Sequence, residues 1–559
     1  MDLRAKCGLL AGIAALIISM TGGATLALAD ETSTGDKLRI LYSNRFTFND
    51  DGIPLVTIEL MSREPSVKLV APGGVSVLPN GDGGSRVDGM REWTISVQGG
   101  KPARIDEWTI VSRFGPDDDA KVRRSMAHWK KLGYAPRSFE IGTLFGVSGS
   151  VFDSRRTLVG IAPVRAPRGK AKARSIARKH NVPTTVHPTM VRRPTGRIVA
   201  RSGSTVIANP SVLWFRPTKS SATVTLKNVR VGHGGSSQRV RREDRRYFGS
   251  IYVTVGVDGK LVVANAVSAD KLLAGIVPSE MFASAPPEAL KAQAIAARTE
   301  LMQKLGRRHL VHPFLLCSTQ QCQVYSGAGR EDPRTTRAVH QTRGMLLMRK
   351  KGGLVDARYS ASCGGHSEHN ENIWGNTTDS SLRGSYDATR SSPYARRFAT
   401  VTDDNLKGFL ALPKTAAWCG KTRFGRASYR WEKRISSAEL DRRVAAKYPS
   451  VGSVRSIQPL TRGVSGRIRR IKLVGSRGTA LVIGDLRIRR TLGGLRSSLF
   501  TVRRDGAAGR AGSFVFRGAG FGHGVGMCQH GAIGMADHGK KHPEILQHYY
   551  RRSAVRRVY

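Results

Sequence analysis

The chain has 559 residues, with 91 lysines and arginines against 41 aspartates and glutamates, which gives a formal net charge of +50 at pH 7. This length suggests two or three domains. So basic a chain usually suggests nucleic-acid binding, but the sequence has neither zinc-finger spacing nor an aromatic RNA-binding motif. We expect anionic envelope polymers as partners and no nucleic acid; the alternative is that the charge only solvates the surface.

The N-terminus is typical of a secretory signal. Arg4 and Lys6 precede a short apolar stretch at 9–20, and Ala27-Leu28-Ala29 is an A-x-A cleavage site. We expect residues 1–29 to be removed and the protein to be secreted or periplasmic, in the cell envelope. The alternative is a retained anchor, although the apolar stretch is short for a bilayer span. The sequence predicts no other transmembrane segment.

Residues 30–165 are predicted to form an accessory domain of unknown role, with envelope or glycan binding as one option. Runs typical of strands surround a predicted helix at 119–132, whose apolar residues recur at helical spacing. This pattern is faintly similar to a small glycan-binding repeat domain. The predicted strands are 37–42, 55–60, 93–97, 139–144 and 158–163.

Residues 166–204 are rich in Arg, Lys, Pro and Thr and poor in large apolar residues, which predicts a basic linker. Strand patterns return at Thr205. A hairpin is expected from 250–257 and 261–266, around Asp258-Gly259. We assign residues 205–559 to one catalytic-type domain.

One carboxylate stands out within this domain. The apolar run 276–281 delivers Glu280 to a turn, and an Ala-rich helix is expected to begin at Pro287, a residue suited to a first helical position. Lys291 and Arg298 are seven residues apart and therefore share a face of that helix. The alternative is that Glu280 only caps the following segment.

Two further motifs follow. Tyr359-Ser360-Ala361-Ser362-Cys363-Gly364-Gly365-His366 is the first, and 520–532 is a Gly-rich loop that runs into a helix. Glycines allow close approach of a ligand to the backbone, so we expect His523 and Gln529 to line a cleft as sugar-binding or supporting groups. The alternative is that the glycines form tight turns and His523 bonds to the backbone.

In this order, these strings resemble the stage II sporulation protein D family, which also contains the amidase-enhancer proteins. The resemblance runs from about residue 205 or 245 to the C-terminus. It implies an α+β fold, with mixed sheets and helices around a glycan-binding cleft, preceded by a smaller α+β accessory region. Other matching pieces are 323–325, 429–431, 465–467, 489–490, 495–497 and 545–550.

The resemblance implies a peptidoglycan lytic transglycosylase that prefers strands stripped of stem peptides, with Glu280 as the catalytic carboxylate. Such a group first protonates the glycosidic oxygen and then, as a base, takes the proton of the muramic acid 6-hydroxyl, so a 1,6-anhydro end forms without a second carboxylate or a cofactor. We expect partial burial by Ile276, Val277, Met281 and Phe282 to keep it protonated.

The same resemblance implies substrate binding by Lys291, Gln293 and Arg298; the alternative for the two cations is a structural role. A second functional hypothesis is a non-enzymatic glycan-binding protein that enhances an N-acetylmuramoyl-L-alanine amidase. A third is a basic, polymer-binding structural protein, which explains the charge but not the motifs.

Five cysteines remain after removal of the leader, an odd number. Some members of the family bind zinc through a His–Cys–His–Cys cluster in the segment that holds His312, Cys317 and Cys322. Gln321 stands at the second histidine position, and glutamine is a poor zinc ligand. The alternatives are a structural zinc, completed by His366 or Cys363, and a disulfide between Cys317 and Cys322.

Overall fold

The computed structural model describes most of the chain. The predicted signal peptide lies outside the described residues, and so does most of the predicted strand 37–42, of which Leu41 is helical. Among the helices that are described, none combines the length and apolarity needed to cross a bilayer. The described residues are 41–42, 52–79, 87–147, 150–182, 185–219, 221–231, 241–319, 322, 324–350, 352–375, 378–506 and 512–559.

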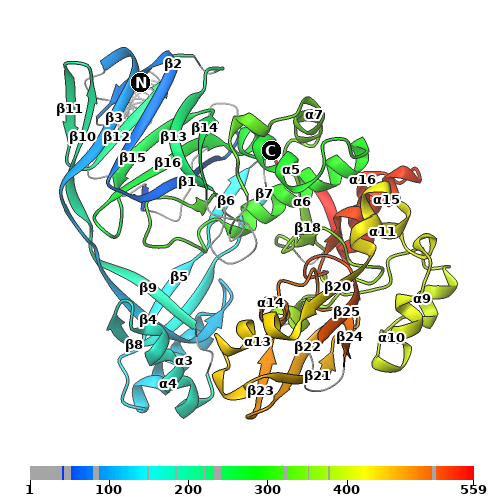
Figure 1. The fold of residues 1–559 in the computed structure, drawn as a ribbon. Helices are drawn as coiled ribbons and strands as arrows, with labels where there is room; N and C mark the ends of the chain where they lie inside the picture. Colours follow the sequence, from blue (N-terminus) through cyan, green and yellow to red (C-terminus); the bar gives the residue numbers. More distant parts are fainter. Residues whose placement is uncertain are drawn as a thin grey trace, which may run out of the picture.

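The N-terminal half is built on a large sheet to which eleven of the described strands belong (Figure 1). Its main path runs β11-β10-β3-β2-β12-β15-β16-β1-β17, with β13 and β14 branching from β2. The strands are β1 (Leu55–Glu64), β2 (Ser66–Leu78), β3 (Val87–Lys101), β10 (Thr195–Ser202), β11 (Thr205–Asn209), β12 (Val212–Pro217), β13 (Val224–Val231), β14 (Arg241–Tyr247), β15 (Ser250–Val255), β16 (Leu261–Ser268) and β17 (Leu316–Cys317).

The predicted hairpin around Asp258-Gly259 is confirmed, since Val255 and Leu261 are paired at its end. The predicted boundary at residue 205 is not a boundary in the structure, because strands from both sides of it pair in this one sheet. The apolar strand positions were visible in the sequence, but their pairing over long separations was not.

A smaller α+β module is inserted between β3 and β10. Its four-stranded sheet has the order β5-β8-β4-β9, with two helices in a βαββαβ chain order typical of ferredoxin-like folds. The elements are β4 (Arg104–Phe114), α3 (Asp119–Lys131), β5 (Arg137–Ile141), β6 (Leu144–Val147), β7 (Ser150–Asp153), β8 (Arg156–Arg165), α4 (Gly169–His180) and β9 (Thr185–Arg192).

The prediction of a linker at 166–204 is wrong, because this segment forms α4, β9 and β10. Helix α4 needs few apolar residues to dock, since its buried positions are only Gly169, Ala173 and Ile176. Its many exposed cations gave the segment the composition of a linker. The predicted helix at 119–132 and the predicted strand at 158–163 are confirmed as α3 and β8.

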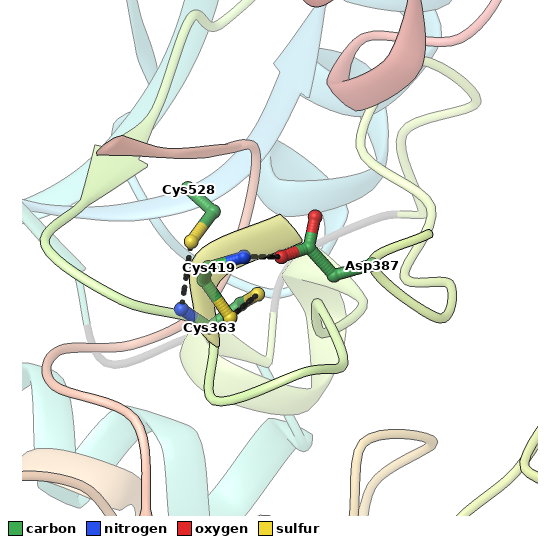
Figure 2. A group of neighbouring side chains, drawn as sticks. All are labelled: Cys363, Asp387, Cys419 and Cys528. Atoms are coloured by element: carbon green, nitrogen blue, oxygen red, sulfur yellow. Dashed lines mark hydrogen bonds between the residues drawn. The ribbon is translucent and has the colours of Figure 1, made fainter. Parts of the chain in front are cut away.

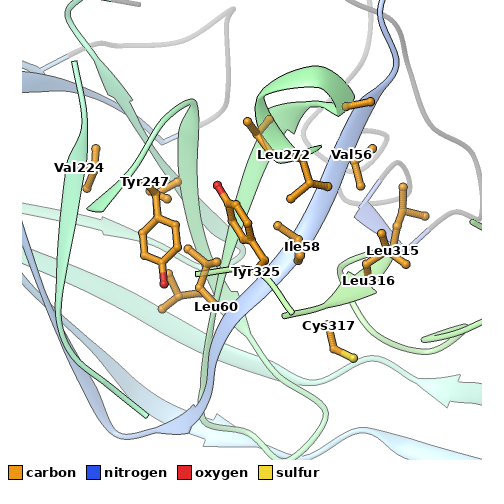
Figure 3. Packing of buried hydrophobic residues seen from close by; sticks show 14 of the residues in the cluster. Val56, Ile58, Leu60, Val224, Tyr247, Leu272, Leu315, Leu316, Cys317 and Tyr325 are labelled. Carbon is orange, nitrogen blue, oxygen red and sulfur yellow. The ribbon is translucent and has the colours of Figure 1, made fainter. Parts of the chain in front are cut away.

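Three helices pack beside the large sheet: α5 (Ala269–Glu280), α6 (Pro287–Lys304) and α7 (Pro333–Gln341). Helix α5 contacts β1 and β16, and α6 and α7 pack on α5. Leu272 of α5 packs among strand residues such as Val56 and Ile58, together with Tyr325 (Figure 3). Helix α6 begins at Pro287, as predicted. This core fixes the end of α5, where Glu280 lies.

The C-terminal half adds short sheets and helices. Its sheets are β20-β25-β24, β21-β22-β23, β18-β27 and β19-β26, so the whole protein is mixed α+β, as expected. The strands are β18 (Met345–Arg349), β19 (Tyr359–Ser360), β20 (Arg430–Ser436), β21 (Val454–Arg462), β22 (Ile468–Gly475), β23 (Thr479–Ile483), β24 (Phe500–Asp505), β25 (Ser513–Ala519), β26 (Met527–Cys528) and β27 (Ser553–Arg557). The helices are α8 (Asn370–Trp374), α9 (Pro393–Arg397), α10 (Asp403–Leu410), α11 (Trp418–Lys421), α12 (Arg426–Tyr429), α13 (Ser437–Ala445), α14 (Asp485–Thr491), α15 (Gln529–Asp537) and α16 (His542–Tyr549).

Candidate active site

Glu280 is the last residue of α5 and is partly buried. The pKa of its carboxyl is raised from 4.5 to about 7, first by burial and then by the Glu300 carboxylate, against the lowering effects of Lys304 and a hydrogen bond from the Val324 backbone. A carboxyl with this pKa is substantially protonated at neutral pH, as a general acid must be.

The apolar surroundings expected for Glu280 are found in part. Ile276, Val277 and Met281 are buried. Phe282 is 57% exposed and stacks instead on Phe424, with ring centroids 5.0 Å apart. Phe282 therefore does not supply the burial expected of it, because its ring packs on a surface neighbour.

A second carboxylate, Glu300, was missed by the sequence analysis. It lies on α6, is 7% exposed, and forms an ion pair with Lys304 at 2.7 Å. Gln293, Glu300 and Lys304 are spaced by seven and four residues, so they form one polar stripe along a largely buried helix. That stripe was the available signal in the sequence, whereas Lys291 and Arg298, which were predicted to bind substrate, lie on another face of α6.

Gln529 and Gln293 position Glu280. The Gln529 side-chain amide donates to the Glu280 backbone carbonyl at 2.9 Å and to Gln293 Oε1 at 3.2 Å. Both glutamines are buried. They therefore connect the Gly-rich loop, α6 and the end of α5, and they hold the backbone of Glu280 in place.

On another side of Glu300 lies Arg358, whose guanidinium is 3.7 Å from the Glu300 carboxylate. Arg358 also lies over the ring of Trp374, 5.2 Å from its centroid, and Trp374 is 44% exposed. The hydroxyl of Tyr359 is hydrogen-bonded to Glu300, and burial raises the pKa of Tyr359 well above its usual value, with the charges of Glu280 and Glu300 adding to the rise. Through Arg358, these contacts connect the Glu300 carboxylate to an exposed aromatic ring.

His523 belongs to the same region. Its ring centroid is 5.1 Å from that of Trp374, and its Nδ1 accepts a hydrogen bond from the backbone N–H of Val525 at 3.0 Å. Burial lowers the pKa of His523 to about 3, so the ring is neutral. His523 therefore forms a hydrogen bond to the backbone, as the alternative to sugar binding predicted, and it also lies beside the exposed ring of Trp374.

Lys291 and Arg298 form the ion pairs and hydrogen bonds of a structural role, which was the alternative to substrate binding. Lys291 pairs with Glu288 at 2.9 Å. Arg298 is fully buried, and its guanidinium donates to the carbonyls of Thr342 at 2.8 Å and Val339 at 3.0 Å and approaches Asp270 at 3.3 Å. Arg298 therefore ties α6 to α5 and α7, and a substrate cannot reach it.

The Gly-rich loop depends on its glycines, as Gly524 and Gly526 show. Gly524 and Gly526 have φ values of 75° and 71°. A Cβ at Gly524 would overlap the buried guanidinium of Arg467, and a Cβ at Gly526 would overlap the carbonyl oxygen of Arg358. The loop therefore packs against Arg358 as closely as a backbone can, next to the pair that Arg358 forms with Glu300.

A cavity of about 890 Å³ lies between the inserted module and the end of α6. Lys304 and Arg358 belong to its wall, so it reaches the partners of Glu300, whereas Glu280 itself does not line it. Arg113 and Arg156 come from the module. The other cations in the wall are Arg307 and Arg308, and the acidic residue is Asp356.

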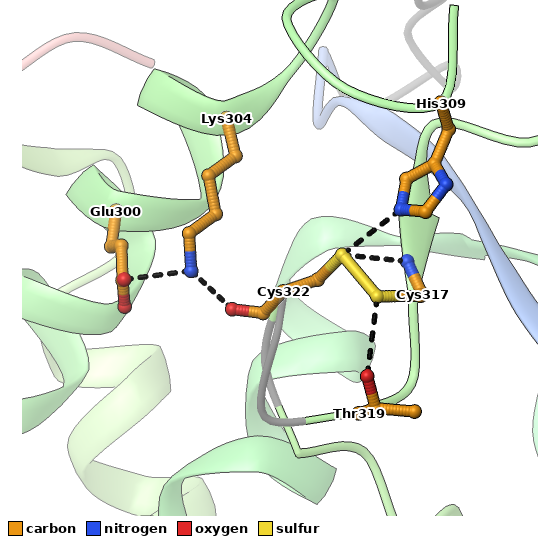
Figure 4. The surroundings of a disulfide bond; sticks show 6 residues. All are labelled: Glu300, Lys304, His309, Cys317, Thr319 and Cys322. Carbon is orange, nitrogen blue, oxygen red and sulfur yellow. Dashed lines mark hydrogen bonds and ion pairs between the residues drawn. A yellow bond between two sulfur atoms is a disulfide. The ribbon is translucent and has the colours of Figure 1, made fainter. Parts of the chain in front are cut away.

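Cys317 and Cys322 form a disulfide (Figure 4). His309, rather than the predicted His312, contacts it, with Nε2 3.2 Å from the sulfur of Cys322. A disulfide leaves neither sulfur as a thiolate ligand, so it and a zinc ion at this place exclude each other. His366 takes no part, because its ring nitrogens lie 2.7 Å and 3.2 Å from the carbonyls of Ser367 and Ala399.

The arrangement defines a mixed α+β protein with a partly buried, protonatable carboxylate between an Ala-rich helix and a Gly-rich loop. Residues 257–348, which hold Glu280 and the stripe on α6, match the family model described as Stage II sporulation protein. Residues 368–526 match a model described as a domain of unknown function.

Several known proteins are similar to this chain. An uncharacterized protein of Brachyspira hyodysenteriae is 29% identical over 304 residues, which is 54% of this chain and 70% of that protein. The amidase enhancer of Bacillus subtilis is 28% identical over 50% of this chain and 39% of its own length. The stage II sporulation protein D of Bacillus amyloliquefaciens is 27% identical over 50% of this chain and 72% of its own length. These matches confirm the resemblance to the stage II sporulation protein D family.

Proposed function

We propose that this protein is an exported peptidoglycan lytic transglycosylase that cleaves glycan strands and leaves 1,6-anhydro-muramic acid ends. The observation that carries the proposal is the environment of Glu280, which raises the pKa of that carboxyl to about 7 while leaving it partly accessible. The resemblance to this family supports the cell-wall substrate.

In this reaction Glu280 donates its proton to the leaving glycosidic oxygen. The resulting carboxylate takes the proton from the 6-hydroxyl of the muramic acid, whose oxygen attacks the anomeric carbon, so no water is consumed. Gln529 and Gln293 hold the end of α5 that carries Glu280. The charge of Glu300 raises the pKa of Glu280, and that of Lys304 lowers it. Lys304 and Arg358 both pair with Glu300.

The basic cavity supports an anionic strand as the substrate. A glycan stripped of its stem peptides keeps a lactyl carboxylate on each muramic acid, and such groups match a wall with Arg113, Arg156 and Lys304. The exposed ring of Trp374 offers an apolar face for a sugar ring near the same end. The inserted module would then extend the binding site beyond the catalytic carboxylate.

The decisive test uses stripped strands, prepared with an amidase, and the variant Glu280→Gln. The wild type should release products with anhydro-muramic ends, and the variant should lose at least about 10²–10⁴-fold in rate, because glutamine cannot donate the proton. Glu432→Gln is the matched control, since Glu432 is exposed on β20 and pairs only with Arg517 in the contacts described. Cleavage by Glu280→Gln at the wild-type rate would refute the assignment.

The same experiment distinguishes the enzyme from a non-enzymatic amidase enhancer, the second hypothesis, which the similarity to an amidase enhancer supports. A wild type that cleaves nothing but accelerates an added cell-wall amidase would establish that role instead.

Binding is tested separately with Arg113→Glu, which reverses a charge of the cavity wall. The control is Arg123→Glu, which makes the same change on the exposed surface of α3, outside that wall. Only Arg113→Glu should weaken pelleting with stripped strands.

A further inference from the structure

Three cysteines outside the disulfide, Cys363, Cys419 and Cys528, meet at one buried point with Asp387 (Figure 2). One ligand atom from each of the four residues lies within 4.8 Å of the others. All four side chains are at most 1% exposed. Three sulfurs and one carboxylate oxygen around a common point make the ligand number and type of a closed tetrahedral zinc site.

The four residues come from segments far apart in the chain. Cys363 follows β19, Cys419 lies in α11, and Cys528 ends β26. Sequence separations of 56 residues between Cys363 and Cys419 and 165 between Cys363 and Cys528 hide the cluster from any spacing rule. Only the fold brings these residues together.

The backbone around the sulfurs is arranged for a thiolate. The sulfur of Cys528 accepts hydrogen bonds from the N–H groups of Cys363 at 3.0 Å and Gly531 at 3.3 Å. Donors directed at a sulfur stabilise its anionic form, which is the form that binds a metal. The sulfurs of Cys363 and Cys419 are 3.7 Å apart, so they are not joined as a disulfide.

The carboxylate is held by partners of its own. One oxygen of Asp387 accepts from the N–H of Cys419 at 3.0 Å, and the other accepts from the hydroxyl of Tyr549 at 2.8 Å and lies 3.5 Å from His548. Outer hydrogen bonds of this kind orient a metal-binding carboxylate. Buried thiols alone would pack as small apolar groups, but an apolar cluster does not favour a buried carboxylate among them.

We propose that Cys363, Asp387, Cys419 and Cys528 bind one zinc ion. On binding, the three thiols release their protons to solvent, and the three thiolates and the carboxylate fill all four positions. No position is left for a water or a substrate, so the site is structural. It also uses all three cysteines that the structure describes outside the disulfide, whereas a disulfide between two of them would leave the third unpaired.

The position of the ion gives it a consequence for the active site. Cys528 directly precedes Gln529, the residue whose amide holds the backbone of Glu280. The metal would fasten the start of α15 to α11 and to the loop after β19. Loss of the ion should therefore loosen the positioning of Glu280, although the site itself stands independently of the proposed reaction.

The test measures metal in the full-length protein, purified without chelators or added metal. We expect about one zinc per chain, the count for a single four-ligand site. After removal of zinc, titration with cobalt(II) should give the intense sulfur-to-cobalt bands and the visible bands of a tetrahedral site. Cys419→Ser should lose the metal or bind it more weakly. The double variant Cys317→Ser/Cys322→Ser, which removes the disulfide and leaves the cluster intact, should retain it.

Three outcomes would overturn the proposal. The first is a metal-free protein whose three thiols are all alkylated on denaturation and which gives no tetrahedral cobalt spectrum. The second is a disulfide among the three cysteines in the purified protein. The third is loss of zinc in the double variant, which would move the ion to the Cys317 region. If Cys419→Ser does not fold, the cobalt spectrum of the wild type decides.

Discussion

The environment of Glu280 predicts a cost in stability that can be measured apart from any activity. The folded protein holds the proton of this carboxyl more tightly than the unfolded chain, because its pKa rises from 4.5 to about 7 on folding. The free energy of unfolding should therefore fall as the pH rises from about 4.5 to about 7. Glutamine cannot ionise, so Glu280→Gln should escape this loss.

The magnitude follows from the two pKa values. The free energy of unfolding of Glu280→Gln should exceed that of the wild type by less than about 1 kcal/mol at pH 5 and by about 3 kcal/mol at pH 8, where the difference levels off. Equilibrium urea unfolding, followed by tryptophan fluorescence at pH 5, 6, 7 and 8, measures this difference. Contributions of other groups cancel between the two proteins.

Glu432→Gln serves as the control, since Glu432 is exposed and outside the site. The hydrogen bond from Val324 is available to glutamine as well, and any effect through it does not vary with pH over this range. A difference between Glu280→Gln and wild type that is the same at every pH, or one that grows toward acid, would refute the reasoning about burial.

Four further predictions follow from the site and the sequence. Glu300→Gln should move the alkaline limb of the pH–rate profile to lower pH, because removing the Glu300 charge lowers the pKa of Glu280. A limb that stays at the same pH would show that Glu300 does not influence the pKa of Glu280. Arg298→Ala should destabilise the protein by about 3–5 kcal/mol in urea unfolding, because it leaves Asp270 buried without this partner, and a change confined to glycan affinity would contradict that structural role. Alkylation without reductant should leave Cys317 and Cys322 unmodified, and replacing both by serine should cost about 2 kcal/mol for so short a loop; two freely alkylated thiols would disprove the disulfide. Sequencing of the exported protein should begin at Asp30, and a sequence that begins at Met1 would exclude cleavage after Ala29.

Local signals in the sequence were sufficient where a single residue sets a local structure. Asp258-Gly259 marks the turn of a real hairpin, and Pro287 begins α6. The burial of Glu280 followed from the apolar residues before it. These features depend on neighbours within a few positions, so the sequence displays them directly.

Other features depend on tertiary contacts that no local pattern shows. Glu300 matters because α6 turns it toward Glu280, twenty positions earlier. Arg298 looked like a binding cation, but the carbonyls that hold it come from α7 and the residue just after it. The folded segment 166–204 was hidden by its surface charge, since helices and strands that bury few side chains keep the composition of a linker.

The place where the inserted module joins the large sheet has a consequence for folding kinetics. Lys101 of β3 and Thr195 of β10 are paired, so the chain leaves the sheet and returns to it at neighbouring points. If the module is unfolded, that pairing closes a loop of about 93 residues, which costs about 3 kcal/mol more than closing a four-residue turn. A module that folds first removes this cost by bringing its two ends together. We therefore expect pulse-labelling hydrogen exchange to show protection in β4 and β8 before β3 and β10, so that the insertion acts as a nucleus for the sheet that carries it.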